Sequence, residues 1–296
     1  MADSPWSEIE RAIGAATGTP FAITSRAGVG GGCINECHLV HGRGQSYFVK
    51  LNAPERREMF AAEAAGLEEI GRTRTIRVPR PVGHGANREA SWIVLEHLPL
   101  EPATGEAWCA LGTRLARLHR VTAAAHGWER DNTIGATPQV NTPTTDWIAF
   151  WRERRLGFQL TLAQLNGRDG RLADRGARLL ERLPALFGGH RPAPSLLHGD
   201  LWSGNAAMTA SGEPVIYDPA VYYGDRETDL AMTELFGGFP RQFYDAYRVE
   251  YPLDPGYESR KPLYNLYHVL NHLNLFGGGY GAQAERMIDQ LLAIAG

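Results

Sequence analysis

The sequence has few cysteines and no long apolar run, and each shortage excludes a class of protein. Its 296 residues include three cysteines: Cys33, Cys37 and Cys109. Three is an odd number and too few for a disulfide scaffold, and no histidine cluster completes a zinc set around the first two. No apolar stretch approaches the roughly 20 residues that span a bilayer. The N-terminus lacks the basic segment and apolar core of a signal peptide, so we expect a cytoplasmic protein without membrane partners.

The chain also lacks an excess of positive charge. Its 30 basic and 33 acidic residues give a formal net charge of −3. Binding nucleic acid through counterion release requires excess positive charge, so we expect no nucleic-acid partner. Lysine is scarcest of all, since the basic residues are arginine except at Lys50 and Lys261. In a chain that otherwise uses arginine for its basic residues, a lysine indicates a position where a compact ammonium is needed and a planar guanidinium does not fit.

The pattern of helices and strands changes near residue 97. Before it, short strand-like runs flank one long helix expected over 54–70, and 78–85, with its two prolines, is expected to be a loop. Beyond it, helices dominate and are interrupted by a strand–loop–strand unit at 195–217. We therefore expect an α+β fold of two lobes, a β-rich N-terminal lobe over 1–97 and a mostly helical C-terminal lobe over 98–296.

Residues 196–205 (LLHGDLWSGN) have the wiring of a kinase catalytic loop. An apolar strand leads to Asp200 and Asn205, five residues apart, and a second short strand delivers Asp218 thirteen residues later. In that wiring Asp200 orients the substrate hydroxyl and accepts its proton, while Asn205 and Asp218 hold magnesium against the nucleotide phosphates. Oxygen ligands suit magnesium. Asp and Asn also favour turns, so the order of the whole set carries the interpretation.

Lys50 ends the strand-like run YFVK, which matches the apolar-apolar-Lys pattern of the third kinase strand. There the ammonium contacts the α- and β-phosphates and pairs with a glutamate of the following helix. We choose Glu63 as this partner, and Glu58 and Glu68 remain open as alternatives.

A glycine cluster at 28–32 precedes that strand. Gly30, Gly31 and Gly32 would let backbone N–H groups approach phosphates. The cluster is no Walker A loop, which removes P-loop ATPases from the candidates. Cys33 follows directly, so we expect it to line the nucleotide site, where its thiol would be sensitive to oxidation.

Two departures from protein kinases narrow the family. The chain has His198-Gly199-Asp200 where those enzymes have His-Arg-Asp, and Asp218-Pro219-Ala220 where they have Asp-Phe-Gly. Both resemble the branch of small-molecule kinases that includes aminoglycoside and choline phosphotransferases. Within that branch the chain resembles the fructosamine-kinase (ketosamine 3-kinase) family over essentially its whole length. Four stretches carry this resemblance: GGCIN (31–35), FVKLN (48–52), HGDLWSGN (198–205) and YDPAVYYGDRE (217–227).

The resemblance implies a bilobal protein-kinase-like fold that binds ATP and Mg²⁺ between its lobes. It also implies phosphorylation of a sugar hydroxyl of a ketoamine, whose amine part is a free amino acid, a peptide or a glycated protein lysine. The backbone of Glu96, His97 and Leu98 would receive adenine. The alternatives are a kinase of another small alcohol, of the aminoglycoside, choline or homoserine type, and a non-catalytic pseudokinase. The intact catalytic set argues against the pseudokinase, and a monomer and a homodimer both remain open.

The substrate side is less defined by the sequence. Trp202, beside Asp200, either stacks on a sugar ring or plugs the interface between the lobes. Asp225 or Glu227 would meet a substrate amine. Asp229 is expected to brace the catalytic loop through its backbone, and His119 is expected to be structural.

The scarcity of lysine leads to a test of Lys50. In Lys50→Arg a planar guanidinium replaces a compact ammonium of the same charge. We expect activity to fall at least about tenfold, roughly 1.4 kcal/mol of transition-state stabilisation, if the residue anchors phosphates in a tight site. Steady-state kinetics of the purified variant measure this loss. Full activity would return Lys50 to an ordinary solvated strand end.

Overall fold

The computed structural model describes residues 4–30 and 34–296, so Gly31, Gly32 and Cys33 lie outside the described residues. The chain divides into two compact units. The first consists of Met1–Ala107 and Ala206–Pro219, and the second of Trp108–Asn205 and Ala220–Gly296.

This division corrects the expected boundary at residue 97. Strand β6 (Leu100–Glu101) lies beyond that boundary and pairs with β10 (Ala206–Thr209), which also pairs with β11 (Pro214–Ile216). This three-stranded sheet draws the hairpin after the catalytic loop into the N-terminal unit. The chain therefore passes between the units three times instead of once.

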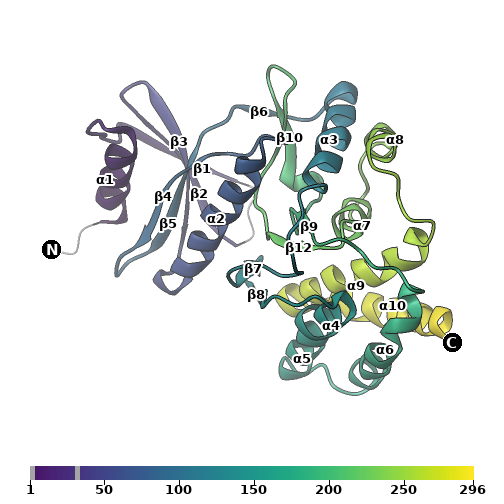
Figure 1. The fold of residues 1–296 in the computed structure, drawn as a ribbon. Coiled ribbons are helices and arrows are strands. Elements are labelled where there is room, and N and C mark those ends of the chain that lie inside the picture. Colours follow the sequence, from purple (N-terminus) through teal and green to yellow (C-terminus); the bar gives the residue numbers. More distant parts are fainter. Residues whose placement is uncertain (1–3, 31–33) are drawn as a thin grey trace. The chain divides into compact units, whose positions relative to one another are not determined.

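The first unit is built on a five-stranded antiparallel sheet with the strand order β1-β2-β3-β5-β4. Helices α1 and α2 lie on opposite faces of this sheet (Figure 1). A short 3₁₀ turn over Pro54–Arg56 leads into α2. The elements are α1 (Pro5–Thr17), β1 (Ser25–Val29), β2 (Glu36–Gly42), β3 (Gln45–Asn52), α2 (Arg57–Thr73), β4 (Pro81–Ala86) and β5 (Ser91–Glu96).

Local sequence signals account for much of this unit. Helix α1 begins after Ser4, whose side chain accepts a hydrogen bond from a backbone N–H of the first turn, and ends at the left-handed Gly18. Its Ile9 and Ile13 are fully buried against the sheet. Strands β2 and β3 join through Arg43-Gly44, whose φ angles of 52° and 73° belong to a type I′ hairpin turn.

Strand β4 was not expected. The segment 78–85 has two prolines and ends in glycine, which predicted a loop, yet Pro81–Ala86 pairs with β5. β4 is the edge strand of the sheet, where proline is tolerated, and its register shifts between Pro81 and Gly83. Trp92 of the partner strand lies over Gly85, where a Cβ would collide with the indole ring.

The second unit is mostly helical and contains two short two-stranded sheets, β9–β12 and β7–β8. Strand β9 leads into the catalytic loop, which ends in a 3₁₀ turn over Ser203–Asn205. A π-helical stretch, Trp151–Gly157, joins α4 to α5. The elements are α3 (Gly105–Leu118), β7 (Asn132–Ile134), β8 (Thr137–Gln139), α4 (Trp147–Phe150), α5 (Phe158–Leu165), α6 (Arg171–Phe187), β9 (Ser195–Leu197), β12 (Tyr222–Gly224), α7 (Glu227–Leu235), α8 (Arg241–Glu250), α9 (Tyr257–Phe276) and α10 (Tyr280–Ala295).

Helix α9 forms the interior of the second unit. It packs against α5, α6, α7 and α10, and most of its side chains between Tyr257 and Leu273 are buried. A helix that is buried on nearly all sides needs apolar or paired polar residues around its whole circumference. Among the described residues, no helix is long and apolar enough to cross a bilayer.

Candidate active site

In the first unit, Lys50 lies on the central strand β3 and points to the face of the sheet that α2 covers. Its side chain is only 4% exposed, and its Nζ lies 2.7 Å from Glu63 Oε1 and 2.5 Å from Asp218 Oδ1. The ion pair expected with Glu63 is therefore present, and it forms in preference to Glu58 or Glu68. Burial disfavours the ammonium, but the two carboxylates outweigh it and raise the pKa of Lys50 above its ordinary value. Lys50 is a fixed buried cation.

Asp218 reaches Lys50 because the β10–β11 hairpin belongs to the same unit. Its backbone is left-handed, with a φ of 57°, which is uncommon for a residue with a side chain. Aspartate tolerates this region better than most residues do. One carboxylate oxygen pairs with Lys50, while 45% of the side chain remains exposed. The carboxylate thus has room to accept a metal ion beside the lysine.

In the second unit, Asp200 and Asn205 lie on one tight loop. The Asn205 Nδ2 donates to the backbone carbonyl of Asp200 at 2.8 Å. Because the amide nitrogen of Asn205 is used in this hydrogen bond, its side-chain oxygen is the atom left to bind a metal ion. The carboxylate of Asp218 in the first unit and the amide oxygen of Asn205 in the second are each hard oxygen donors of the kind that magnesium takes.

The catalytic loop is held from beneath by Asp229 on α7. Its two carboxylate oxygens accept the backbone N–H groups of His198 at 2.7 Å and Gly199 at 2.8 Å. His119, fully buried, lies 3.1 Å from the same carboxylate and 2.8 Å from the hydroxyl of Tyr247. Burial opposes ionisation of Asp229, but these contacts hold its pKa below the ordinary range. The bracing role expected of Asp229 and the structural role expected of His119 are both confirmed.

Two glycines permit the close packing of this loop. Gly199 has a φ of 84°, and a Cβ there would overlap the carbonyl oxygen of Ala220. Gly204 lies under the indole ring of Trp202, where a Cβ would collide with the ring. The Trp202 ring is held edge-on against Phe236 at 6.3 Å, and 37% of the residue remains exposed. An exposed, fixed indole two residues from Asp200 is consistent with stacking on a sugar ring, although filling an interior position remains the alternative.

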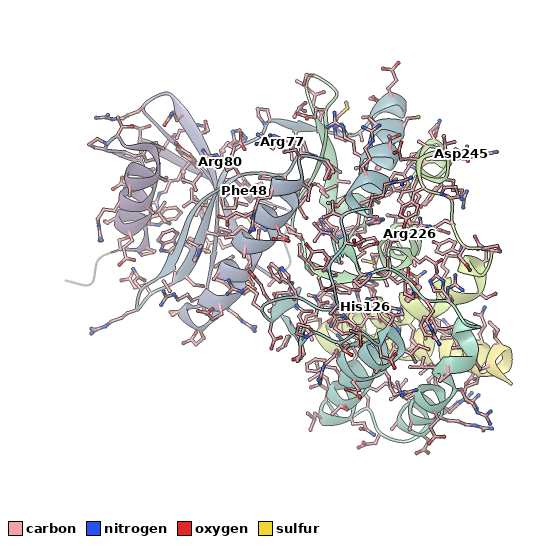
Figure 2. All side chains as sticks on the ribbon, in the orientation of Figure 1. Phe48, Arg77, Arg80, His126, Arg226 and Asp245 are labelled. Carbon is pink, nitrogen blue, oxygen red and sulfur yellow. The ribbon has the colours of Figure 1, made fainter. Side chains whose placement is uncertain are left out.

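The segment expected to receive adenine follows β5. Glu96 is the last residue of that strand, and its carboxylate accepts hydrogen bonds from the Arg77 guanidinium at 2.5 Å and the Arg80 backbone N–H at 3.1 Å; both arginines are labelled in Figure 2. These contacts fix the strand end from which His97 and Leu98 continue outside any strand.

Asp225 and Glu227 do not belong to this group. Gly224 pairs with Ser195 at the start of β9, whereas the catalytic loop leaves the other end of that strand. Asp225 accepts hydrogen bonds from His190 at 2.8 Å and Tyr264 at 2.5 Å, and Glu227 pairs with both donor nitrogens of Arg260 at 2.8 Å. Both carboxylates are buried and engaged within the protein, which corrects the expectation that they meet a substrate amine.

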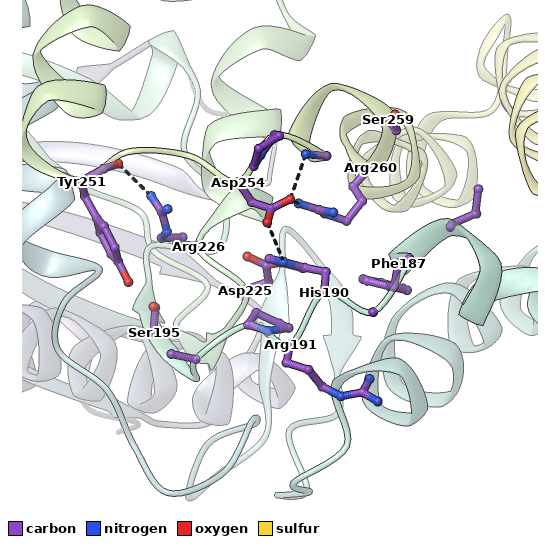
Figure 3. A pocket seen from close by; sticks show the side chains of 17 residues that line it. Phe187, His190, Arg191, Ser195, Asp225, Arg226, Tyr251, Asp254, Ser259 and Arg260 are labelled. Carbon is purple, nitrogen blue, oxygen red and sulfur yellow. Dashed lines mark hydrogen bonds and ion pairs between the residues drawn. The ribbon is translucent and has the colours of Figure 1, made fainter.

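Of these residues, His190, Asp225 and Arg260 line a cavity of about 800 Å³ in the second unit (Figure 3). Asp254 lies at its centre, paired with Arg260 at 2.6 Å and 3.9 Å from His190. His190, Asp225 and Glu227 form a group, among the described residues, close enough to share a metal ion. Each of them already has a protein partner, so the cluster is better described as a network of internal ion pairs. Asp225 and Glu227 were expected near the substrate because they closely follow Asp218 in the sequence.

The comparisons with known proteins show the family of the chain. A family model described as fructosamine kinase matches residues 5–294. A "Probable ketoamine kinase" of Synechocystis sp. is 51% identical over 98% of each chain. A chloroplastic protein-ribulosamine 3-kinase of Arabidopsis thaliana is 45% identical over 93% of this chain and 85% of its own.

Solved structures show the same relationship. A crystal structure of a protein assigned as a fructosamine-3-kinase from Haemophilus somnus has a TM-score of 0.90 and 31% identity over 97% of both chains. An aminoglycoside phosphotransferase has a TM-score of 0.66 at 12% identity, over 97% of this chain and 98% of its own. That second likeness establishes a shared protein-kinase-like fold.

The ion-pair network around His190 predicts a pH-dependent stability. Burial disfavours the charged imidazole, but the hydrogen bond and charge of Asp225 outweigh it and raise the pKa of His190. The resulting stabilisation is complete below the unfolded pKa of about 6.5 and is lost as the pH rises through the higher folded value. In His190→Gln we therefore expect a melting temperature below that of the wild type at acidic pH, with the gap closing toward alkaline pH.

Thermal unfolding followed by circular dichroism across this pH range measures the effect. Arg191→Gln is the matched control, because Arg191 is the next residue along the chain and lines the same cavity. The control should keep the pH slope of the wild type. If the melting temperatures of His190→Gln and the wild type changed with pH in parallel, the result would contradict the assignment.

Proposed function

Because this chain belongs to the fructosamine kinase family, we propose that it transfers the γ-phosphoryl group of ATP to a sugar hydroxyl of a ketoamine. The observation that carries this proposal is the buried Lys50, paired at once with Glu63 and Asp218. A kinase needs this lysine–glutamate pair to hold nucleotide phosphates and the aspartate to hold magnesium beside them. A lysine at a solvated strand end would be exposed, whereas Lys50 is buried and paired with two carboxylates.

The residues divide the work as follows. Lys50 anchors the α- and β-phosphates, and Glu63 keeps its ammonium in place. Asn205 and Asp218 would hold Mg²⁺, which neutralises charge on the phosphates. Asp200 orients the acceptor hydroxyl and takes its proton. Such a transfer needs little covalent chemistry from the protein, so positioning and charge neutralisation supply most of the acceleration.

The nucleotide base and the acceptor are assigned to different segments. We assign adenine to the backbone of Glu96, His97 and Leu98, and the phosphates to the glycine cluster that includes Gly30, Gly31, Gly32 and Cys33. We assign the sugar of the acceptor to the face of Trp202, because aromatic rings stack on the apolar faces of sugars and this indole is held rigidly beside Asp200. Asp225 and Glu227 have no place in this assignment.

A screen of acceptors tests the proposed reaction. ATP consumption by the purified protein is measured with ketoamines derived from free amino acids, peptides and protein lysines, and with aminoglycosides and choline. We expect turnover with ketoamines to exceed turnover with the other acceptors. A preference for an aminoglycoside or choline would replace the proposed acceptor, and no turnover with any of them would contradict a kinase of this group.

Asp200→Asn tests the catalytic step within that screen. The amide cannot accept the hydroxyl proton, and removal of a general base costs roughly 10²- to 10⁴-fold in rate. Nucleotide affinity, measured by calorimetry, should stay close to that of the wild type, since Asp229 holds the backbone of the loop directly before Asp200. A variant that retained more than about half of the rate would show that Asp200 is not the base.

A further inference from the structure

The β7–β8 hairpin places two buried amide side chains next to each other. Asn132 and Gln139 are opposite one another in the register of the two strands, and both are buried. The Nε2 of Gln139 donates to the Oδ1 of Asn132 at 2.8 Å. Buried amides are costly unless their donors and acceptors are paired, so the remaining bonds of this pair show what it holds.

Those remaining bonds reach the chain just beyond Asp218. The Nδ2 of Asn132 donates to the carbonyl of Val221 at 2.8 Å, and the Nε2 of Gln139 donates to the carbonyl of Ala220 at 3.1 Å. The two hairpin amides thus grip two successive carbonyls of a segment some 80 residues away in the sequence.

The same segment is held from its other side by the catalytic loop. The N–H of Ala220 donates to the carbonyl of His198 at 2.8 Å. Gly199 permits this approach, because a Cβ there would overlap the Ala220 carbonyl oxygen. Ala220 is therefore fixed at its N–H by the catalytic loop and at its carbonyl by Gln139.

The orientation of the two amides is itself determined. The hydroxyl of Tyr267 donates to Gln139 Oε1 at 2.8 Å, so the amide nitrogen must face Ala220. The Nδ2 of Asn141 donates to Asn132 Oδ1 at 2.9 Å, and Arg155 in turn donates to Asn141 at 2.7 Å. A network in which each amide has its donors and acceptors assigned specifies one arrangement of its members.

Asp218 depends on this arrangement through the backbone. It is two residues before Ala220 and has a left-handed φ of 57°. A residue with a side chain keeps such a conformation when the surrounding structure fixes the chain on both sides. Strand β11 fixes the chain before Asp218, and the Ala220–Val221 carbonyls, held by the hairpin, fix it after.

We propose that Gln139 and Asn132 are positioning residues for the phosphoryl transfer. They touch neither substrate nor metal. They act by fixing the Ala220 and Val221 carbonyls, and through them the direction of the backbone that follows Asp218. The inference rests on the proposed function, in which Asp218 is a magnesium ligand. It assigns to the hairpin a role in the affinity for magnesium–nucleotide beyond packing in the core.

The test is Gln139→Met, which keeps the length of the side chain and removes the donor to Ala220. The affinity for ADP is measured by calorimetry with and without Mg²⁺, and the ratio of the two dissociation constants gives the magnesium enhancement. We expect this enhancement to fall about 5- to 10-fold, near the lower end of what loss of an outer partner of a metal ligand costs. Metal-free ADP affinity should change less than about twofold, because Asp218 contributes to binding mainly through the ion.

Gln159→Met is the matched control. Gln159 is a fully buried glutamine of the same unit, and its amide bonds Asn271, Asn274 and the hydroxyl of Tyr267 instead of the Ala220 carbonyl, so its replacement leaves the bond from Gln139 to Ala220 in place. It should lose thermal stability comparably and keep the magnesium enhancement of the wild type. Equal enhancement in both variants would overturn the proposal and leave Gln139 as a core residue.

Two further outcomes are decisive. If Gln139→Met does not fold, as judged by circular dichroism, Tyr267→Phe replaces it, since it removes only the hydroxyl that orients Gln139. There we expect a smaller loss of enhancement, about threefold, and an unchanged value would overturn the proposal. If Mg²⁺ does not enhance ADP binding even in the wild type, the proposed function fails, and this inference fails with it.

Discussion

The carboxylate of Asp229 is the contact on which the catalytic half of the structure depends. It is buried, and it accepts the N–H groups of His198 and Gly199 directly before Asp200. A buried charge that accepts two backbone hydrogen bonds fixes those peptide groups in direction as well as in place. The carbonyl of His198, oriented in this way, then accepts the N–H of Ala220. Through these two steps one side chain of α7 determines the local geometry of two catalytic segments.

The same packing accounts for the glycine at position 199. A side chain there would meet the Ala220 carbonyl and would also oppose the positive φ of Gly199. The small side chain of Ala220 lies against the same glycine. Gly199 and Ala220 are therefore two parts of one contact.

The sequence allowed a candidate catalytic set to be named, because its members lie within short motifs of fixed order. The Lys50–Glu63 pair could be anticipated from a strand followed by a helix, although choosing among three glutamates required the helix to be in place. Asp225 and Glu227 were misassigned, since distance along the chain does not reveal that β12 carries them to the far end of β9.

The hairpin β7–β8 was missed altogether. Its strands are three residues long, one contains Pro138, and neither alternates clearly between apolar and polar positions. Its polar residues bond the Ala220 and Val221 carbonyls, and the sequence does not reveal that these segments lie together in the fold. The π-helical stretch Trp151–Gly157 could likewise not be anticipated, because a helical pattern of side chains does not distinguish a π-helix from an α-helix.

The discontinuous first unit has a consequence for synthesis of the protein. Lys50 and Glu63 leave the ribosome early, whereas Asp218 follows 168 residues after Lys50. At ordinary translation rates that interval lasts on the order of 10 s. During it the nascent N-terminal sheet has a lysine with one of its two carboxylate partners and lacks the β10–β11 hairpin that pairs with β6. The first unit therefore reaches its final form only after the catalytic loop has emerged, and the second unit is completed later still, because it needs the chain through Gly296.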